Sequence, residues 1–158
     1  MSAPRATTVP LALERASAAP RALLALGMPG CAACLLLPAS LAEVARARPG
    51  LTIAIGEFAT VEDWALRERL LWPRGIHVSR ASVPAMALLE GGEVVATRPG
   101  GGPAAVIDAW LAERLGPAAH PVPEGLAPGE AEALEGLSDL VGRHRSVKSA
   151  RQGAYDRG

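Results

Sequence analysis

The hydrophobic positions of the chain fall into runs whose lengths and order predict alternating strands and helices. Two short runs, Arg21–Met28 and Leu51–Phe58, are apolar at most successive positions, which is typical of strands covered on both faces. Between them we predict a helix from about Cys31 to Arg46, weakened at Pro38 because proline has no N–H to donate. A strand, a helix and a second strand at this spacing predict a right-handed parallel crossover.

The remaining pattern adds two helices, a hairpin and a final helix. Thr60 and Asp63 have the spacing of a capping box, in which each side chain accepts a hydrogen bond from the other residue's backbone N–H. The further predicted elements are a helix over 10–18, a helix over 60–71, strands over 83–89 and 94–97, and a helix over 103–116. This order predicts an α/β fold in which a mixed sheet of about four strands is flanked by helices on both faces.

The composition changes after Gly116, and we divide the chain there. We expect a flexible N-terminus over 1–9, a domain over 10–116, and a Pro-rich linker with a charged extension over 117–158. A short helix over 130–141 is predicted from leucines spaced by three and four. Residues 124–139 hold five acids and no base, whereas residues 142–158 hold five bases and one acid. Two interpretations stay open here: a solvated tail, or a helix that makes a charge-guided contact with a partner.

Composition and charge exclude several classes of protein. Hydrophobic residues make up 49% of the 158 and charged residues 20%, which argues against a disordered chain. Sixteen basic and sixteen acidic side chains cancel, so nothing indicates binding to nucleic acid. Two cysteines are too few for a secreted scaffold held together by disulfides.

An uncharged stretch over 22–42 raises the question of a membrane segment. Its length would allow a helix to span a bilayer, but Pro29 and Gly30 lie near its middle, and Glu14 interrupts the start of any signal peptide. We therefore favour a buried strand followed by a helix, with no membrane partner and a cytoplasmic location. An export or membrane signal stays open as the alternative.

Cys31 and Cys34 have the CxxC spacing at a predicted strand-to-helix junction. Free N–H groups at a helix start favour negative charge, and in that setting the pKa of a thiol falls from about 8.5 toward 7. We interpret Cys31 as the exposed nucleophile and Cys34 as the residue that resolves a mixed disulfide. Two alternatives are a pair of buried structural cysteines and half of a zinc site. The histidines available to a zinc site are His77, His120 and His144.

A second feature is Ser82-Val83-Pro84, directly before the first predicted hairpin strand. With the CxxC pair and the order of elements, it makes roughly residues 20–116 resemble the thioredoxin family. The resemblance implies that Pro84 follows a cis peptide bond and lies against Cys31. It also implies that a substrate groove is lined by Gly30, Val83 and Gly100.

The resemblance further implies a thiol–disulfide oxidoreductase that reduces or exchanges disulfides through Cys31 and Cys34. Its partners would be a protein or small-molecule disulfide and an unidentified recycling reductase. We expect a monomer that needs no cofactor and no metal, since the dithiol itself carries the electrons.

Departures from the family pattern suggest a second function. Gly30 stands where an aromatic residue is usual, Ala32 and Ala33 lie between the cysteines, and Ala25 or a neighbour replaces a buried acid. Related accessory proteins of nickel–iron hydrogenase maturation keep the fold and bind a client, often without redox cysteines. The alternative is therefore a chaperone-like protein that binds its client without redox turnover.

Overall fold

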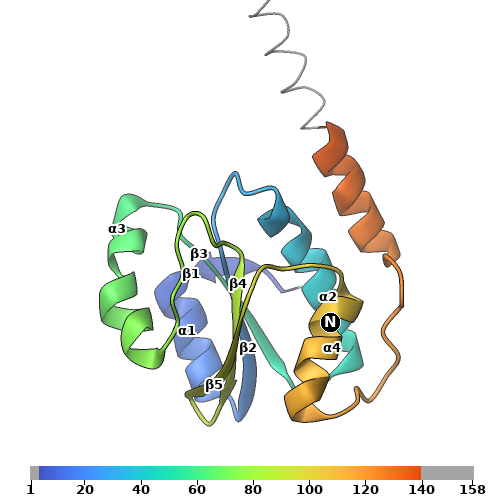
Figure 1. Ribbon diagram of the computed structural model, residues 1–158, viewed down its shortest axis with the longest axis horizontal. Helices are drawn as coiled ribbons and strands as arrows, with labels where there is room; N and C mark the ends of the chain where they lie inside the picture. Colours follow the sequence, from blue (N-terminus) through green and yellow to red (C-terminus); the bar gives the residue numbers. More distant parts are fainter. Residues whose placement is uncertain (1–3, 140–158) are drawn as a thin grey trace, which may run out of the picture.

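The apolar runs form the centre of a five-stranded sheet in the computed structural model, which describes residues 4–139 (Figure 1). β2 (Arg21–Gly27) is buried at every position after Arg21. It pairs in parallel with β3 (Thr52–Glu57) and antiparallel with β4 (Ala85–Glu90). β5 (Glu93–Pro99) extends the sheet beyond β4, and the strand order is β1-β3-β2-β4-β5. The sheet is therefore mixed, as the order of elements predicted.

Helices cover both faces of this sheet, which confirms the predicted fold class. α1 (Val9–Ala18) and α3 (Val61–Ala65) lie on one face, and α2 (Leu37–Ala47) and α4 (Ala104–Leu115) lie on the other (Figure 1). Alternate side chains of β4 enter the two separate cores, because successive residues of a strand point to opposite faces.

A short edge strand was not predicted. β1 (Ala6–Thr8) pairs in parallel with β3, within the segment over 1–9 that we expected to be flexible. Ala6 and Thr8 are exposed, so the segment carries no alternating apolar signal. Its pairing depends on the open edge of β3, which local sequence does not reveal.

The helix predicted from Cys31 begins later than expected. Ala33–Leu36 form a 3₁₀ turn, and the α-helix starts only at Leu37. Pro38 explains the change, because an α-helix running through it would bring its ring against the carbonyl of Cys34. Leu37 N–H donates to that carbonyl instead, with the shorter 3₁₀ spacing.

The predicted helix over 60–71 is also divided. Its capping box is present: the Thr60 hydroxyl accepts from Asp63 N–H at 3.1 Å, and the Asp63 carboxylate accepts from Thr60 N–H at 2.9 Å. After Ala65 the helix changes to a π-helical segment, Arg67–Leu71. The Arg67 side chain donates to the Trp64 carbonyl at 2.9 Å, which occupies an acceptor that a continued α-helix would use.

The uncharged stretch over 22–42 contributes to a strand, a turn and the first half of α2. No helix among the described residues combines the length and the apolar character needed to cross a bilayer. The run of uncharged residues is accounted for by β2, buried in the sheet, and by α2, whose inner face packs on that sheet.

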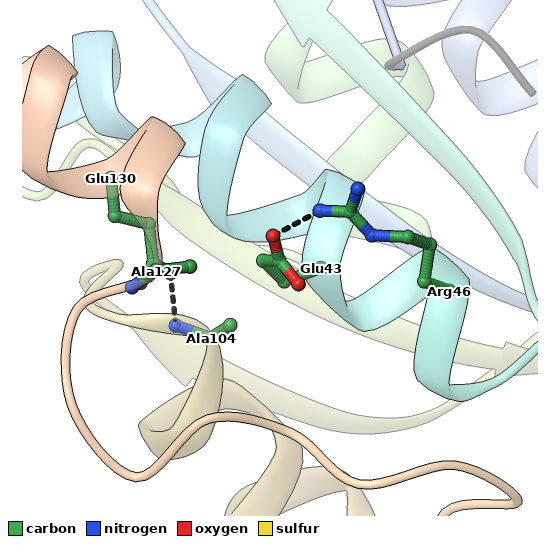
Figure 2. A network of polar contacts seen from close by, with 5 residues as sticks. All are labelled: Glu43, Arg46, Ala104, Ala127 and Glu130. Carbon is green, nitrogen blue, oxygen red and sulfur yellow. Dashed lines mark hydrogen bonds and ion pairs between the residues drawn. The ribbon is translucent and has the colours of Figure 1, made fainter.

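The chain after α4 returns to the domain and forms a helix over residues 128–139, here called the C-terminal helix. Its Glu130 is only 1% exposed. The carboxylate accepts from the N–H of Ala104, the first residue of α4, at 2.6 Å and from Ala127 N–H at 2.8 Å (Figure 2). One side chain therefore caps two helices and joins them. Leu140 and Val141, which we placed in this helix, lie outside the described residues.

Replacing Glu130 by alanine is expected to lower the free energy of unfolding by about 2 kcal/mol or more, because two buried N–H groups lose their acceptor. Urea denaturation followed by tryptophan fluorescence measures the change. Glu132→Ala is the matched control: Glu132 is exposed on the same helix, and its removal should change stability by less than about 0.5 kcal/mol. Equal stabilities of the two variants would contradict the role assigned to Glu130.

Candidate active site around Cys31 and Cys34

The predicted site residues meet at one edge of the sheet. Cys31 and Cys34 follow the carboxyl end of β2, Val83 and Pro84 precede the amino end of β4, and Gly100 follows the carboxyl end of β5. Because β2 and β5 both run antiparallel to β4, these three ends lie together. The fold thus places segments from distant parts of the sequence around the cysteine pair.

Cys31 and Cys34 form a disulfide with their Cα atoms 5.2 Å apart. Cys34 N–H donates to the Cys31 carbonyl at 3.1 Å and also lies 3.2 Å from Cys31 Sγ. A hydrogen bond from a backbone N–H stabilises a charged sulfur more than a neutral one. This N–H is placed to donate to the Cys31 sulfur, although that residue precedes a 3₁₀ turn rather than an α-helix.

Cys34 occupies the inner position of the pair. Its Sγ lies over the backbone of Gly27, where an added β-carbon would be only 3.0 Å from the sulfur. Ala25 occupies the strand position at which the sequence lacks the expected acid. It is fully buried, in the apolar cluster that also contains Leu37. The strand beneath the pair consequently supplies no carboxylate at that position.

The Val83–Pro84 peptide bond is cis, and Cys31 Sγ lies 4.0 Å from the Val83 carbonyl oxygen. The Pro84 carbonyl accepts from Gly100 N–H at 2.7 Å. A β-carbon on Gly101 would lie 3.2 Å from the ring of Pro84. The loop after β5 therefore packs directly on the segment that faces Cys31.

Two of the three residues predicted to line a substrate groove, Gly30 and Gly100, are glycines in a conformation that other residues rarely adopt. Gly30 and Gly100 have φ angles of 76° and 82°, in the left-handed region that favours glycine. A β-carbon at either position would meet no atom within 4 Å. Gly30 is exposed, and Val83 and Gly100 are half-buried.

Sequence reasoning missed two residues that shape this site, Gly27 and Gly101. A glycine at the end of a buried strand signals the close approach of another segment, and Gly27 fits that signal. Gly101 stands in a run of three glycines, where its contact with Pro84 could not be distinguished from a simple turn.

The alternatives for the cysteine pair can be compared with this geometry. Both cysteines are half-buried, whereas structural cysteines of a core would be fully covered. His77 and His120 are exposed, and His144 lies outside the described residues. Within residues 4–139 no group of three or more His, Cys, Asp or Glu side chains is arranged to hold a metal ion.

Comparison with solved structures identifies the fold. The chain is similar to the reduced desulfothioredoxin of Desulfovibrio vulgaris Hildenborough, with a TM-score of 0.56 and 20% identity over 72% of this chain and 99% of that one. Thioredoxin f2 of Chlamydomonas reinhardtii gives a TM-score of 0.54 and 14% identity, over 72% and 98% of the two chains. No family model and no curated protein matches the sequence. The chain has a thioredoxin-like fold, as its motifs predicted.

Replacing Gly27 by alanine is expected to disfavour the disulfide, because the new methyl group would press on Cys34 Sγ. Overpacking of about 1 kcal/mol corresponds to about a fivefold smaller equilibrium constant for disulfide formation. Equilibration in glutathione redox buffers, with the thiols trapped by alkylation, measures this constant. Gly50→Ala is the control, since a β-carbon there meets nothing within 4 Å. An unchanged constant in Gly27→Ala would show that the contact does not restrain the sulfur.

Proposed function

We propose that the protein is a thiol–disulfide oxidoreductase that reduces or exchanges disulfides of proteins or small molecules. The observation that carries this proposal is the Cys31–Cys34 pair itself, half-buried and bonded, with Cys31 Sγ 4.0 Å from the Val83 carbonyl oxygen. A buried structural disulfide would need neither the N–H directed at Cys31 Sγ nor access for a peptide.

The first step is attack by Cys31. Its thiolate, favoured by Cys34 N–H at 3.2 Å, attacks one sulfur of the substrate disulfide. The substrate S–S bond breaks, one substrate sulfur leaves as a thiolate that takes a proton from water, and a mixed disulfide joins Cys31 to the other.

The second step is resolution by Cys34. Its thiol loses a proton and attacks Cys31 Sγ, which releases the remaining substrate thiolate and forms the Cys31–Cys34 disulfide. The substrate has then gained two electrons and two protons. A reductase that has not been identified, or a dithiol in the test tube, returns both electrons to the pair. Neither a metal nor an organic cofactor is needed for this cycle.

The groove suits an extended peptide. Val83 supplies backbone groups next to Cys31, and a substrate chain that adds to them as a strand would place its sulfur at the nucleophile. Gly30 and Gly100 leave the space beside Cys31 free of side chains. The groove therefore recognises backbone, and selectivity among protein substrates must arise from contacts outside it.

The residues between the cysteines indicate the direction of electron flow. Ala32 and Ala33 are small, exposed and uncharged, so they add no cation that would stabilise the Cys31 thiolate further. Strong oxidants owe their potential to a strongly stabilised reduced form. We therefore propose a reductant or an exchange enzyme, placed in the cytoplasm, where such a pair is kept reduced.

A second candidate function is client binding without redox turnover, as in an accessory or chaperone protein. The observation that favours it is the burial of Ala25 in an apolar cluster, which leaves Cys34 without an acid on that strand to take its proton. A variant with both cysteines replaced by serine separates the two functions. Such a variant would lose all disulfide reduction if the pair is catalytic, and it would still support the client if the protein acts only by binding.

In an assay with dithiothreitol as the electron donor, Cys31→Ser is expected to lose all catalysis of insulin disulfide reduction. The rate with this variant should equal the rate with dithiothreitol alone. Cys34→Ser should instead trap the substrate as a mixed disulfide on Cys31, because the resolving thiol is gone. Turbidity of precipitating insulin and mass spectrometry of the trapped species measure the two effects. Full activity of Cys31→Ser would refute the proposed function.

A further inference from the structure

The C-terminal helix begins beside the two helix starts that flank the cysteine pair. A β-carbon on Gly129 would lie 3.8 Å from the β-carbon of Ala39, in the first turn of α2. Glu130 binds the first residue of α4, Ala104, which follows the loop that begins at Gly100. Figure 1 shows the helix extending from there past the edge of the sheet at which the 28–36 turn lies.

The position of this helix is held by buried polar contacts. A carboxylate as buried as that of Glu130 is stable only when its oxygens are hydrogen-bonded, and both oxygens accept from backbone N–H groups. Ala127, which precedes the helix, is also buried. A solvated tail, which was one interpretation of this segment, would leave these groups exposed. The helix is therefore part of the folded domain.

The outward face of the helix is hollow and carries exposed apolar side chains. Leu126 is 46% exposed and Leu134 is 37% exposed. They border a shallow pocket of about 500 Å³. The pocket is lined by Leu126, Ala131, Leu134, Glu135, Ser138 and Asp139, here called the acidic docking face. Its helical members recur at intervals of three and four residues, so they form one continuous stripe.

The segment that carries this face has charges of a single sign. Residues 124–139 include five acids and no base, and Glu130 alone among the five is buried. No ion pair between described residues involves any of the other four. An apolar stripe on a segment whose exposed acids pair with no base among residues 4–139 is complementary to a segment that offers apolar side chains together with lysine or arginine.

We propose that the acidic docking face binds a basic, amphipathic segment that flanks the disulfide of a protein substrate. The inference rests on the proposed function and deepens it, because it names the class of substrate. The groove at Cys31 recognises backbone, whereas the docking face selects among protein chains. Binding at the face raises the effective concentration of the tethered disulfide at Cys31. Substrates that carry such a segment should therefore have a higher kcat/KM.

Three probes test the proposal on the full chain. Two synthetic peptides carry the same intramolecular disulfide, joined by a Gly-Ser spacer to an amphipathic helix of about 14 residues, or four turns. One peptide has leucine and lysine on opposite faces of that helix, and the other has glutamate in place of every lysine. The third probe, 2-hydroxyethyl disulfide, has no flanking segment. Reduction under dithiothreitol is expected to give a kcat/KM about tenfold higher for the lysine peptide than for the glutamate peptide.

Charge reversal identifies the surface responsible. Glu135→Lys combined with Asp139→Lys should abolish the preference for the lysine peptide and leave kcat/KM for 2-hydroxyethyl disulfide unchanged. The matched control reverses two exposed acids on other elements, Glu14→Lys with Glu93→Lys, and should keep the preference. Leu134→Ser should weaken the preference without altering net charge. Equal rates for the two peptides, or equal loss in both double variants, would overturn the proposal.

A binding measurement distinguishes failure of this inference from failure of the proposed function. Peptides with serine in place of cysteine cannot react, and fluorescence anisotropy measures their affinity. If the protein binds the lysine peptide at the docking face but does not reduce 2-hydroxyethyl disulfide, the face exists and the proposed oxidoreductase function is refuted. The assignment of the peptide as a disulfide substrate is then refuted as well. The chain's own basic segment over 142–158 is the competing occupant. If the lysine peptide binds only after Arg143, Arg145 and Lys148 are all replaced by serine, the face is covered by this chain and the proposal fails.

Discussion

The cysteine end of the domain depends on close packing where two glycines lack a β-carbon. Cys34 Sγ lies against the backbone of Gly27, and the ring of Pro84 lies against Gly101. The second contact is accompanied by the hydrogen bond from Gly100 N–H to the Pro84 carbonyl at 2.7 Å. The first contact seats the turn after β2 on its own strand, and the second joins the segment before β4 to the loop after β5. Cys31 and Val83, 4.0 Å apart from sulfur to carbonyl oxygen, lie where these two close-packed parts of the domain meet.

Much of this arrangement could be predicted because its signals are local. The CxxC spacing, the buried runs that became β2 and β3, and the capping box at Thr60 and Asp63 each depend on residues within a few positions of one another. What could not be predicted depends on partners far away in the sequence. β1 exists because β3 has a free edge, and Gly101 matters because Pro84 lies opposite it. A window of sequence contains neither partner.

Glu130 shows why charge patterns are an uncertain guide to burial. It stands among five acids, and such a run usually indicates a solvated surface. Its neighbours Glu132 and Glu135 are exposed as the pattern suggests. Glu130 differs only because its carboxylate meets the first N–H of α4 and the N–H of Ala127. The free N–H groups of a helix start need an acceptor, and here the acceptor comes from 26 residues further along the chain.

The burial of Ala25 connects the chemistry of the pair with the recognition of its substrate. With an apolar side chain at this position, β2 supplies no carboxylate to take the proton of Cys34 in the proposed second step. Until Cys34 attacks, the proposed cycle holds the substrate at the pair through the mixed disulfide on Cys31. Under the proposal, a surface that holds a flanking segment acts before the mixed disulfide forms, because it keeps the substrate disulfide near Cys31.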